Sequence, residues 1–264
     1  MNINFNRNRA QLLCESFLNC KNLEEWRNSD FKNFQINNSQ AKQLSVELKS
    51  DSKDLYHKGI LSFFEGLRSI QNSLYSWATV KLYYSLFYFL RCMMALNNVA
   101  IIRQKSLFYL KAIAGEKPQT KNNRKYNSDH SGTINYFIDL FNSYSLLSQN
   151  IEGINCFEWI MNKRDQINYR EREFHDPGCS NFWEIIESQV KAGRFKDLLK
   201  KYILDNFIIC FQEEHSILAI PIKQALLTKS KVDDEGITLS FSKVQRDFLL
   251  NLIPYNMDDF IRLI

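Results

Sequence analysis

The sequence predicts an all-α fold, in which a helical bundle over residues 51–211 is flanked by an N-terminal extension (residues 1–50) and a C-terminal extension (residues 212–264). Glycine and proline are scarce, with 8 and 4 copies in 264 residues. Sandwiches and barrels need many turns, which consume these residues, and doubly wound sheets need glycines where strands lead into helices. Hydrophobic residues make up 45% of the chain and recur at steps of three and four. This pattern indicates amphipathic helices around a packed core.

Two helices are expected in the first half of the bundle. Residues 54–76 form an amphipathic pattern, and residues 77–97 are apolar on nearly every face, which is typical of a central helix. Lys81 and Arg91 leave only nine uncharged residues between them. A membrane-spanning helix needs about 20, so we expect no contact with a membrane.

Further helices are predicted over residues 129–147, over residues 156–172, once or twice over residues 181–211, and over residues 248–264. The helix that starts at residue 156 must end before Pro177, because proline disfavours helical backbone in the preceding residue. Two β-like runs, residues 216–222 and 237–241, flank a turn-like loop. We therefore expect a small β-hairpin in the C-terminal extension.

Positive charge is concentrated in one stretch. The chain has a net charge of +5, and residues 102–125 alone contain seven basic residues and one acidic residue. Pro118 and the polar residues around it predict a loop in the second half of this stretch. The interleaved aromatic residues suggest RNA contact, with Lys121, Arg124 and Lys125 on the phosphates, although the stretch can equally be a solvated loop.

Common enzyme motifs are absent. We find no glycine-rich phosphate loop, no dinucleotide fingerprint, no nucleophile elbow and no HExxH zinc motif, and the cysteines and histidines lack the spacing of a zinc site. No metal and no cofactor are therefore expected. Cys92 and Cys210 lie in apolar runs and are predicted to be buried thiols, which fits a reducing, cytoplasmic compartment. Residues 1–9 are polar, so no signal peptide is expected.

The segment between residues 161 and 175 contains the most suggestive chemistry. On a helix, Arg164 and Asn168 are about 40° apart and share a face. Arg170 and His175 are five residues apart, so on a helix their side chains would be about 140° apart around the axis and would flank one groove. Histidine transfers protons near neutral pH and arginine binds phosphate through two hydrogen bonds.

Three motifs in this order resemble the HEPN superfamily of helical bundles. They are Lys81-Leu-Tyr83-Tyr84-Ser-Leu-Phe87-Tyr88 on the second helix, His130-Ser-Gly-Thr-Ile-Asn-Tyr-Phe137 on the third and Arg164-Asp-Gln-Ile-Asn168-Tyr169 on the fourth. The resemblance covers residues 54–190. It implies a metal-independent endoribonuclease of a bacterial toxin–antitoxin, abortive-infection or antiviral system, which forms a homodimer with a composite R-x4–6-H site.

The sequence offers two frames for that site. Arg164 is followed at the expected spacing by Tyr169, and tyrosine, with a pKa near 10, is a poor base at neutral pH. Arg170 and His175 form a literal R-x4-H one and a half turns later. We therefore expect Arg170, His175 and Arg164 as catalytic residues and Asn168 and Tyr169 as RNA-binding residues.

Alternatives remain for each of these residues. Arg164 can instead make a buried ion pair, and Asn168 and Tyr169 can be hydrogen-bonding residues between helices. The whole bundle can also be a catalytically inert subunit that binds RNA or a protein partner, such as an antitoxin or a component of a defence complex. His57 and His215 are expected at the surface.

Overall fold

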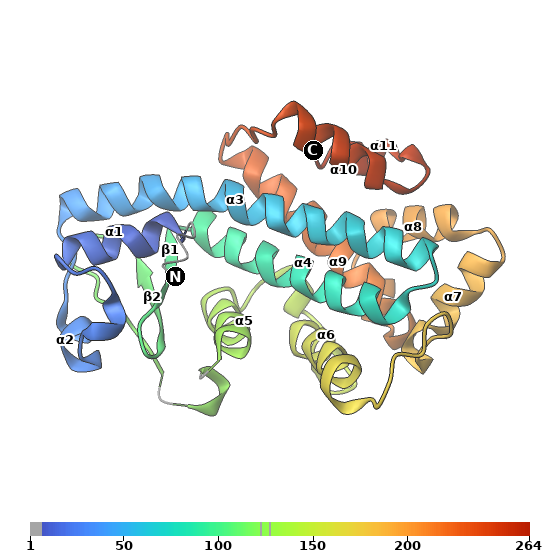
Figure 1. Cartoon of the computed structure of the whole chain (residues 1–264), viewed down its shortest axis with the longest axis horizontal. Coiled ribbons are helices and arrows are strands. Elements are labelled where there is room, and N and C mark those ends of the chain that lie inside the picture. Colours follow the sequence, from blue (N-terminus) through green and yellow to red (C-terminus); the bar gives the residue numbers. More distant parts are fainter. Residues whose placement is uncertain (1–6, 122, 127) are drawn as a thin grey trace, which may run out of the picture. The chain divides into compact units, whose positions relative to one another are not determined.

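The computed structural model describes residues 7–121, 123–126 and 128–264, and for Arg124 only the backbone (Figure 1). Helices make up most of this part of the chain, which confirms the all-α class. The chain forms two compact units, one of residues 1–55 and 90–140 and the other of residues 56–89 and 141–264. The boundaries expected at residues 50 and 211 stay predictions.

The first unit combines short helices with a β-hairpin. It contains α1 (Arg9–Phe17), η1 (Leu23–Glu25), α2 (Asn28–Asn33), the first half of α3 (Asn38–Gln71), the last turns of α4 (Tyr75–Leu96), β1 (Val99–Arg103), β2 (Leu107–Lys111), η2 (Arg124–Tyr126) and α5 (Asp129–Leu140). The expected helix over residues 129–147 therefore ends early, at Leu140.

The antiparallel pair β1–β2 overlaps the first half of the basic stretch 102–125, for which no strand was predicted. It pairs Val99 with Lys111 at one end and Arg103 with Leu107 at the other. Ile102, Phe108 and Leu110 are fully buried. The basic residues lie among β-branched and aromatic residues, which favour strands. The buried apolar side chains among them stabilise the strands.

Side chains fix α1 against this hairpin. The carboxylate of Asp51 accepts hydrogen bonds from the N–H groups of Arg9 and Ala10 at 2.8 and 2.9 Å, which satisfies the start of α1. The Gln11 amide donates to the carbonyl of Arg103 and accepts from its N–H. This amide therefore pairs with the free edge of β1, much as another strand would.

The second unit is built of helices around the remaining halves of α3 and α4. It adds η3 (Ser145–Leu147), β3 (Asn150–Ile151), β4 (Ile154–Asn155), α6 (Cys156–Asp165), the π-helix η4 (Gln166–Arg170), η5 (Asn181–Trp183), α7 (Glu184–Lys191), α8 (Phe195–Leu204), η6 (Ile209–Phe211), α9 (Glu213–Asp234), α10 (Lys243–Leu252), η7 (Pro254–Asn256) and α11 (Asp258–Ile261). The helix expected over residues 248–264 is thus divided between α10, η7 and α11.

Within this unit α3 and α4 approach closely at two glycines. A Cβ on Gly59 would lie 2.7 Å from the Phe89 ring, and one on Gly66 would lie 2.9 Å from Leu82. The C-terminal segment packs against the same part of α3, since the Tyr56 hydroxyl donates to the carbonyl of Leu263 at 2.8 Å. The apolar face predicted for residues 54–76 is therefore buried in this unit from Ile60 to Ile70, although the helix that contains it starts at Asn38 and ends at Gln71.

The β-hairpin expected in the C-terminal extension is wrong. Residues of its first strand lie in the helix α9, with Pro221 inside it, and residues 237–241 form no strand. The run from Ile217 to Ile222 is fully buried on all sides. A short apolar run fits a buried helix as well as a buried strand, and here tertiary burial selects the helix. None of the described helices combines the length and apolar character needed to cross a bilayer.

Candidate functional site

Helix α6 positions the first predicted site residue, Arg164. The side chain of Asn155 caps the helix by accepting from the N–H of Glu158 at 3.0 Å. Arg164 lies in the last turn and is only 4% exposed. Its guanidinium carbon lies 4.3 Å from the centroid of the Tyr83 ring on α4, and Nη1 lies 2.7 Å from the Asp165 carboxylate. Arg164 is therefore stacked and ion-paired, as one of the two interpretations of the sequence expected.

The π-helical turn η4 sets the direction of the next residues. Its closing bond runs from the N–H of Glu171 to the carbonyl of Gln166 at 3.0 Å. Ile167 is buried, Asn168 is half-buried, and the Tyr169 side chain is 73% exposed. One face of the Tyr169 ring lies over Arg164, with 5.7 Å between the ring centroid and the guanidinium carbon. Tyr169 is thus a surface residue braced by a buried cation, not a hydrogen-bonding residue between helices.

His175 and Arg170 do not share a helix. The helical backbone ends at Arg170, because Glu171 is extended, with φ −77° and ψ 139°. The imidazole Nε2 of His175 lies 3.4 Å from the Glu171 carboxylate, and the His175 side chain is 51% exposed. Within the described part of the chain, His175 pairs with Glu171 and not with Arg170. The groove expected from helical spacing is therefore absent, although the two residues remain close in sequence.

The segment that contains His175 is fixed at the start of α4. The N–H of Ser76 donates to the Asp176 carboxylate at 3.1 Å. The Phe174 ring lies edge-on to Trp77, with centroids 5.4 Å apart, and both rings are more than two-fifths exposed. We call residues 169–175 together with Trp77 the aromatic–arginine surface. It exposes three aromatic rings, Arg170, Arg172 and His175.

A small cavity of about 300 Å³ adjoins this surface. Arg170 and Gln166 form part of its wall, together with Glu152, Trp159 and Lys163. Lys163 stacks on Trp159 at 4.8 Å and lies 3.1 Å from the Glu152 carboxylate. Hydrogen bonds from Trp159 and Lys163 lower the pKa of Glu152. Lys163 is therefore neutralised, and Arg170 is the basic residue in the wall of this cavity that is left for an anionic ligand.

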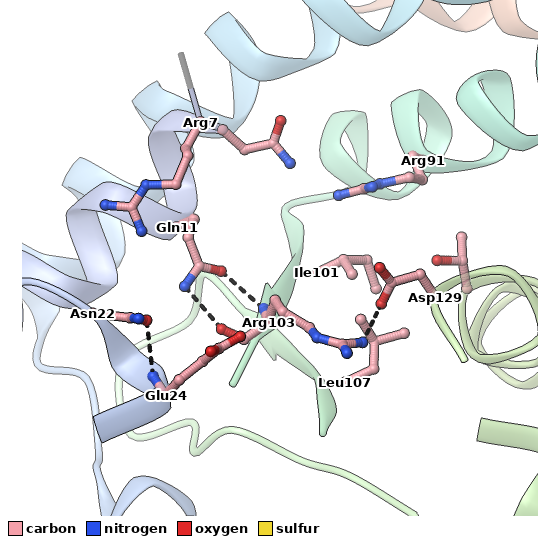
Figure 2. A pocket seen from close by; sticks show the side chains of 11 residues that line it. Arg7, Gln11, Asn22, Glu24, Arg91, Ile101, Arg103, Leu107 and Asp129 are labelled. Carbon is pink, nitrogen blue, oxygen red and sulfur yellow. Dashed lines mark hydrogen bonds and ion pairs between the residues drawn. The ribbon is translucent and has the colours of Figure 1, made fainter. Parts of the chain in front are cut away.

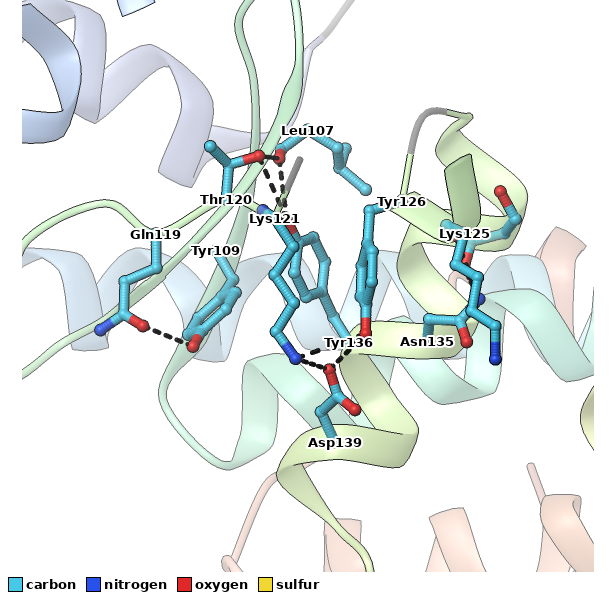
Figure 3. Close-up of polar contacts among 11 residues, drawn as sticks. Leu107, Tyr109, Gln119, Thr120, Lys121, Lys125, Tyr126, Asn135, Tyr136 and Asp139 are labelled. Carbon is cyan, nitrogen blue, oxygen red and sulfur yellow. Dashed lines mark hydrogen bonds and ion pairs between the residues drawn. The ribbon is translucent and has the colours of Figure 1, made fainter. Parts of the chain in front are cut away.

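The predicted basic RNA contacts lie in the first unit. The ammonium group of Lys121 binds the Asp139 carboxylate and lies 3.3 Å from the Tyr126 hydroxyl, which itself donates to Asp139 at 2.7 Å (Figure 3). The hydrogen bond that Lys121 donates to Asp139 raises the pKa of Lys121. Lys121 is thus held by α5. Lys125 is exposed, and Figure 3 draws no bond to its ammonium group. The side chain of Arg124 lies outside the described residues.

The first unit also has a cavity of about 520 Å³ that the sequence did not indicate. Arg7, Arg91 and Arg103 come to it from three separate segments (Figure 2). Acidic neighbours balance two of them, because Arg7 lies 2.7 Å from Glu15 and Arg103 lies 2.5 Å from Asp129. The first pair joins the chain before α1 to that helix, and the second joins β1 to α5.

The structure corrects the expectation that His215 lies at the surface. It is 9% exposed, and its Nδ1 lies 2.8 Å from the Tyr202 hydroxyl. His57 is half-buried beside Phe241, with ring centroids 5.4 Å apart. The apolar residues that follow His215 in the sequence could have indicated its burial. Its partner Tyr202 lies on another helix, so no local pattern could have indicated the hydrogen bond between them.

Nothing matches this chain among protein-family models, curated proteins or solved structures. Over the residues with described positions, no three histidine, cysteine or acidic side chains gather as a metal site would require.

Proposed function

We propose that the chain is a HEPN-like protein that binds single-stranded RNA through the aromatic–arginine surface. The observation behind this proposal is the position of Tyr169, which is 73% exposed beside the exposed Arg170. An aromatic ring on the surface offers a face for stacking a base, and arginine binds the neighbouring phosphate through two hydrogen bonds.

The support beneath Tyr169 favours this role. Arg164 lies between the buried Tyr83 ring and the exposed Tyr169 ring, at 4.3 and 5.7 Å from their centroids. A ring held in this way loses little conformational freedom when a base stacks on it, so less entropy opposes binding. Arg164 would then act as a support for the RNA-binding ring.

Cations and rings lie together around Tyr169. Arg170 and Arg172 are exposed on the same segment, where they alternate with Glu171 and Glu173, and Phe174 and Trp77 add further rings. Single-stranded nucleic acid is bound by this combination of cations and stacking rings, with little dependence on sequence. The resemblance to the HEPN superfamily adds the expectation of a homodimer in a bacterial defence or toxin system.

A second candidate function is cleavage of the bound RNA, and the His175–Glu171 pair favours it. Glu171 lies 3.4 Å from Nε2 and would orient the imidazole. Histidine would accept the proton of the attacking 2′-hydroxyl or supply one to the leaving 5′-oxygen, while Arg170 holds the phosphate.

Binding is tested by fluorescence anisotropy with a short, labelled single-stranded RNA of mixed sequence. We expect Tyr169→Ala to weaken binding by about tenfold, the effect of losing one base–aromatic stack. Phe248→Ala on α10 removes another exposed aromatic ring and is the matched control, with unchanged affinity expected. Equal affinity of wild type and Tyr169→Ala would reject the proposal.

Cleavage is tested separately by incubating total RNA with the protein in EDTA. Loss of cutting in His175→Gln, with unchanged RNA affinity, is the result expected if the second function is present. Cutting that is equal in wild type and variant would exclude His175. Binding without cutting by either protein would leave the chain as an RNA-binding subunit.

A further inference from the structure

The second unit contains a cavity that is separate in its residues from the aromatic–arginine surface. It measures about 370 Å³ and lies where α7, α8 and the start of α9 meet. Its wall is formed by Ile185, Gln189, Arg194, Asp197, Leu198, Lys201 and His215. Cavities that bind small molecules begin at about 300 Å³, so this one can hold a compact ligand.

The hydrogen bond with Tyr202 determines which atom His215 presents to the cavity. Tyr202 is fully buried, and burial raises the pKa of its hydroxyl, so the hydroxyl keeps its proton. The hydroxyl lies 2.8 Å from Nδ1 of His215 and either donates to this nitrogen or accepts from it. Burial and the nearby Lys201 lower the pKa of His215, which favours the neutral ring. A neutral imidazole that accepts at Nδ1 carries its proton on Nε2, the nitrogen left for the cavity.

Two cations accompany this N–H group. Arg194 uses Nε to bind the Gln189 side chain at 2.9 Å, which leaves its terminal nitrogens as donors. Lys201 is exposed on α8, and neither cation takes part in an ion pair within the ranges that the structure describes. Asp197 is the single carboxylate among the residues that form the wall. The wall therefore has an excess of positive charge and of hydrogen-bond donors.

We propose that this cavity binds a phosphate group, which accepts hydrogen bonds from the His215 Nε2–H, the Lys201 ammonium and the Arg194 guanidinium. Phosphate is rich in acceptors and forms its strongest hydrogen bonds with charged donors. Ile185 and Leu198 supply an apolar wall for the rest of the molecule. The phosphate can belong to a small phosphorylated compound or to the backbone of a polynucleotide. This inference does not depend on the function proposed for Tyr169.

The test is isothermal titration calorimetry of the full chain with inorganic phosphate, with AMP and with single-stranded RNA. Lys201→Gln and His215→Phe each remove one donor, and we expect each to weaken binding by about tenfold, as for the loss of one hydrogen bond to a charged group. Lys200→Gln, an exposed neighbour on α8 outside the wall, is the matched control and should bind as wild type does.

Tyr202→Phe tests the positioning of the imidazole. A proton–nitrogen NMR spectrum of the imidazole nitrogens should show His215 protonated on Nε2 in the wild type and a mixture of tautomers in Tyr202→Phe. The circular dichroism spectrum of His215→Phe shows whether this variant folds as the wild type does. If it does not fold, the exposed substitution Lys201→Gln still tests phosphate binding.

Each outcome is informative. Binding of phosphate and AMP that falls in both variants identifies a small phosphorylated ligand. RNA binding that falls in these variants but not in Tyr169→Ala identifies a polynucleotide phosphate. Binding that is unchanged in Lys201→Gln and His215→Phe overturns the proposal and leaves the function proposed for Tyr169 unaffected. Absence of phosphate and AMP binding, with RNA binding that depends on Tyr169 alone, has the same meaning, whereas absence of binding by all three probes overturns both proposals.

Discussion

The guanidinium carbon of Arg164 lies 4.3 Å from the centroid of the Tyr83 ring and 5.7 Å from that of Tyr169, so one arginine links a buried ring to an exposed one. The ion pair with Asp165 holds the arginine in this position. Any change at Arg164 therefore acts on the stability of the unit and on the orientation of the surface ring.

Replacement of Arg164 is expected to destabilise the protein. Arg164→Ala should lower the free energy of unfolding by about 2–4 kcal/mol, because it removes a buried stacked cation and leaves a cavity. Urea denaturation followed by circular dichroism measures this change. Arg170→Ala, an exposed change one and a half turns later, should stay within about 0.5 kcal/mol of wild type. Equal effects of the two substitutions would contradict the buried role of Arg164.

Gly59 allows the close approach of α3 and α4. An added Cβ would lie 2.7 Å from the Phe89 ring, so Gly59→Ala should reduce stability by about 1–3 kcal/mol in spite of the higher helix propensity of alanine. Thermal unfolding measures the loss. Arg68→Ala on the same helix is exposed and should change the melting temperature little. A more stable Gly59→Ala protein would show that the two helices can separate without cost.

The Asp205 carboxylate is expected to make a contribution to the free energy of unfolding that depends on pH. Burial raises its pKa, but hydrogen bonds from the N–H groups of Ile209, Cys210 and Ile208 outweigh this effect and lower the pKa below the ordinary 3.8. A carboxylate with a lowered pKa stabilises the fold above its unfolded pKa, and this stabilisation disappears as the pH falls through the folded pKa.

We therefore expect Asp205→Asn to be less stable than wild type at pH 7, by about 1–3 kcal/mol. The difference between the two proteins should shrink as the pH falls below 4. Urea denaturation of both proteins at several pH values checks this, since carboxylates common to both cancel in the comparison. A difference that is independent of pH would mean that Asp205 does not titrate as inferred.

The cysteines should divide into two kinetic classes toward a thiol reagent. Cys14, Cys92, Cys156 and Cys210 are fully buried, and burial raises the pKa of each thiol. Cys20 and Cys179 are half-buried, although burial and nearby carboxylates also raise their pKa, that of Cys179 to about 11. Access then decides the order, and these two thiols should react first in the native protein.

The measurement is the release of colour from Ellman's reagent at pH 8. Cys20→Ser and Cys179→Ser should each remove part of the fast phase, and Cys92→Ser should leave it unchanged. Fast reaction of more thiols than these two would show that the core opens readily in the native state.

Local patterns predicted the parts of the fold that depend on periodicity. The apolar residues from Ile60 to Ile70 identified a buried helical face, whereas Leu74 lies beyond the end of α3 and is 39% exposed. Pro177 predicted that the helix of Arg164 ends before it. Tyr169, Arg170 and His175 stay predictions as site residues, because their closeness in the chain is a property of the sequence itself. The geometry of this segment was not predicted, because a π-helical turn and an extended Glu171 replace the regular helix that the spacing assumed.

The sequence by itself determined the helical class, the central position of α4 and the concentration of arginines and aromatic rings between residues 164 and 175. Tertiary structure alone decided that residues 217–222 are helical, that Arg164 is buried and that His215 meets Tyr202. The physical reason is that helical periodicity is a local property, written in neighbouring residues. Burial and hydrogen-bond partners depend on segments that are distant in the chain, so no local pattern records them.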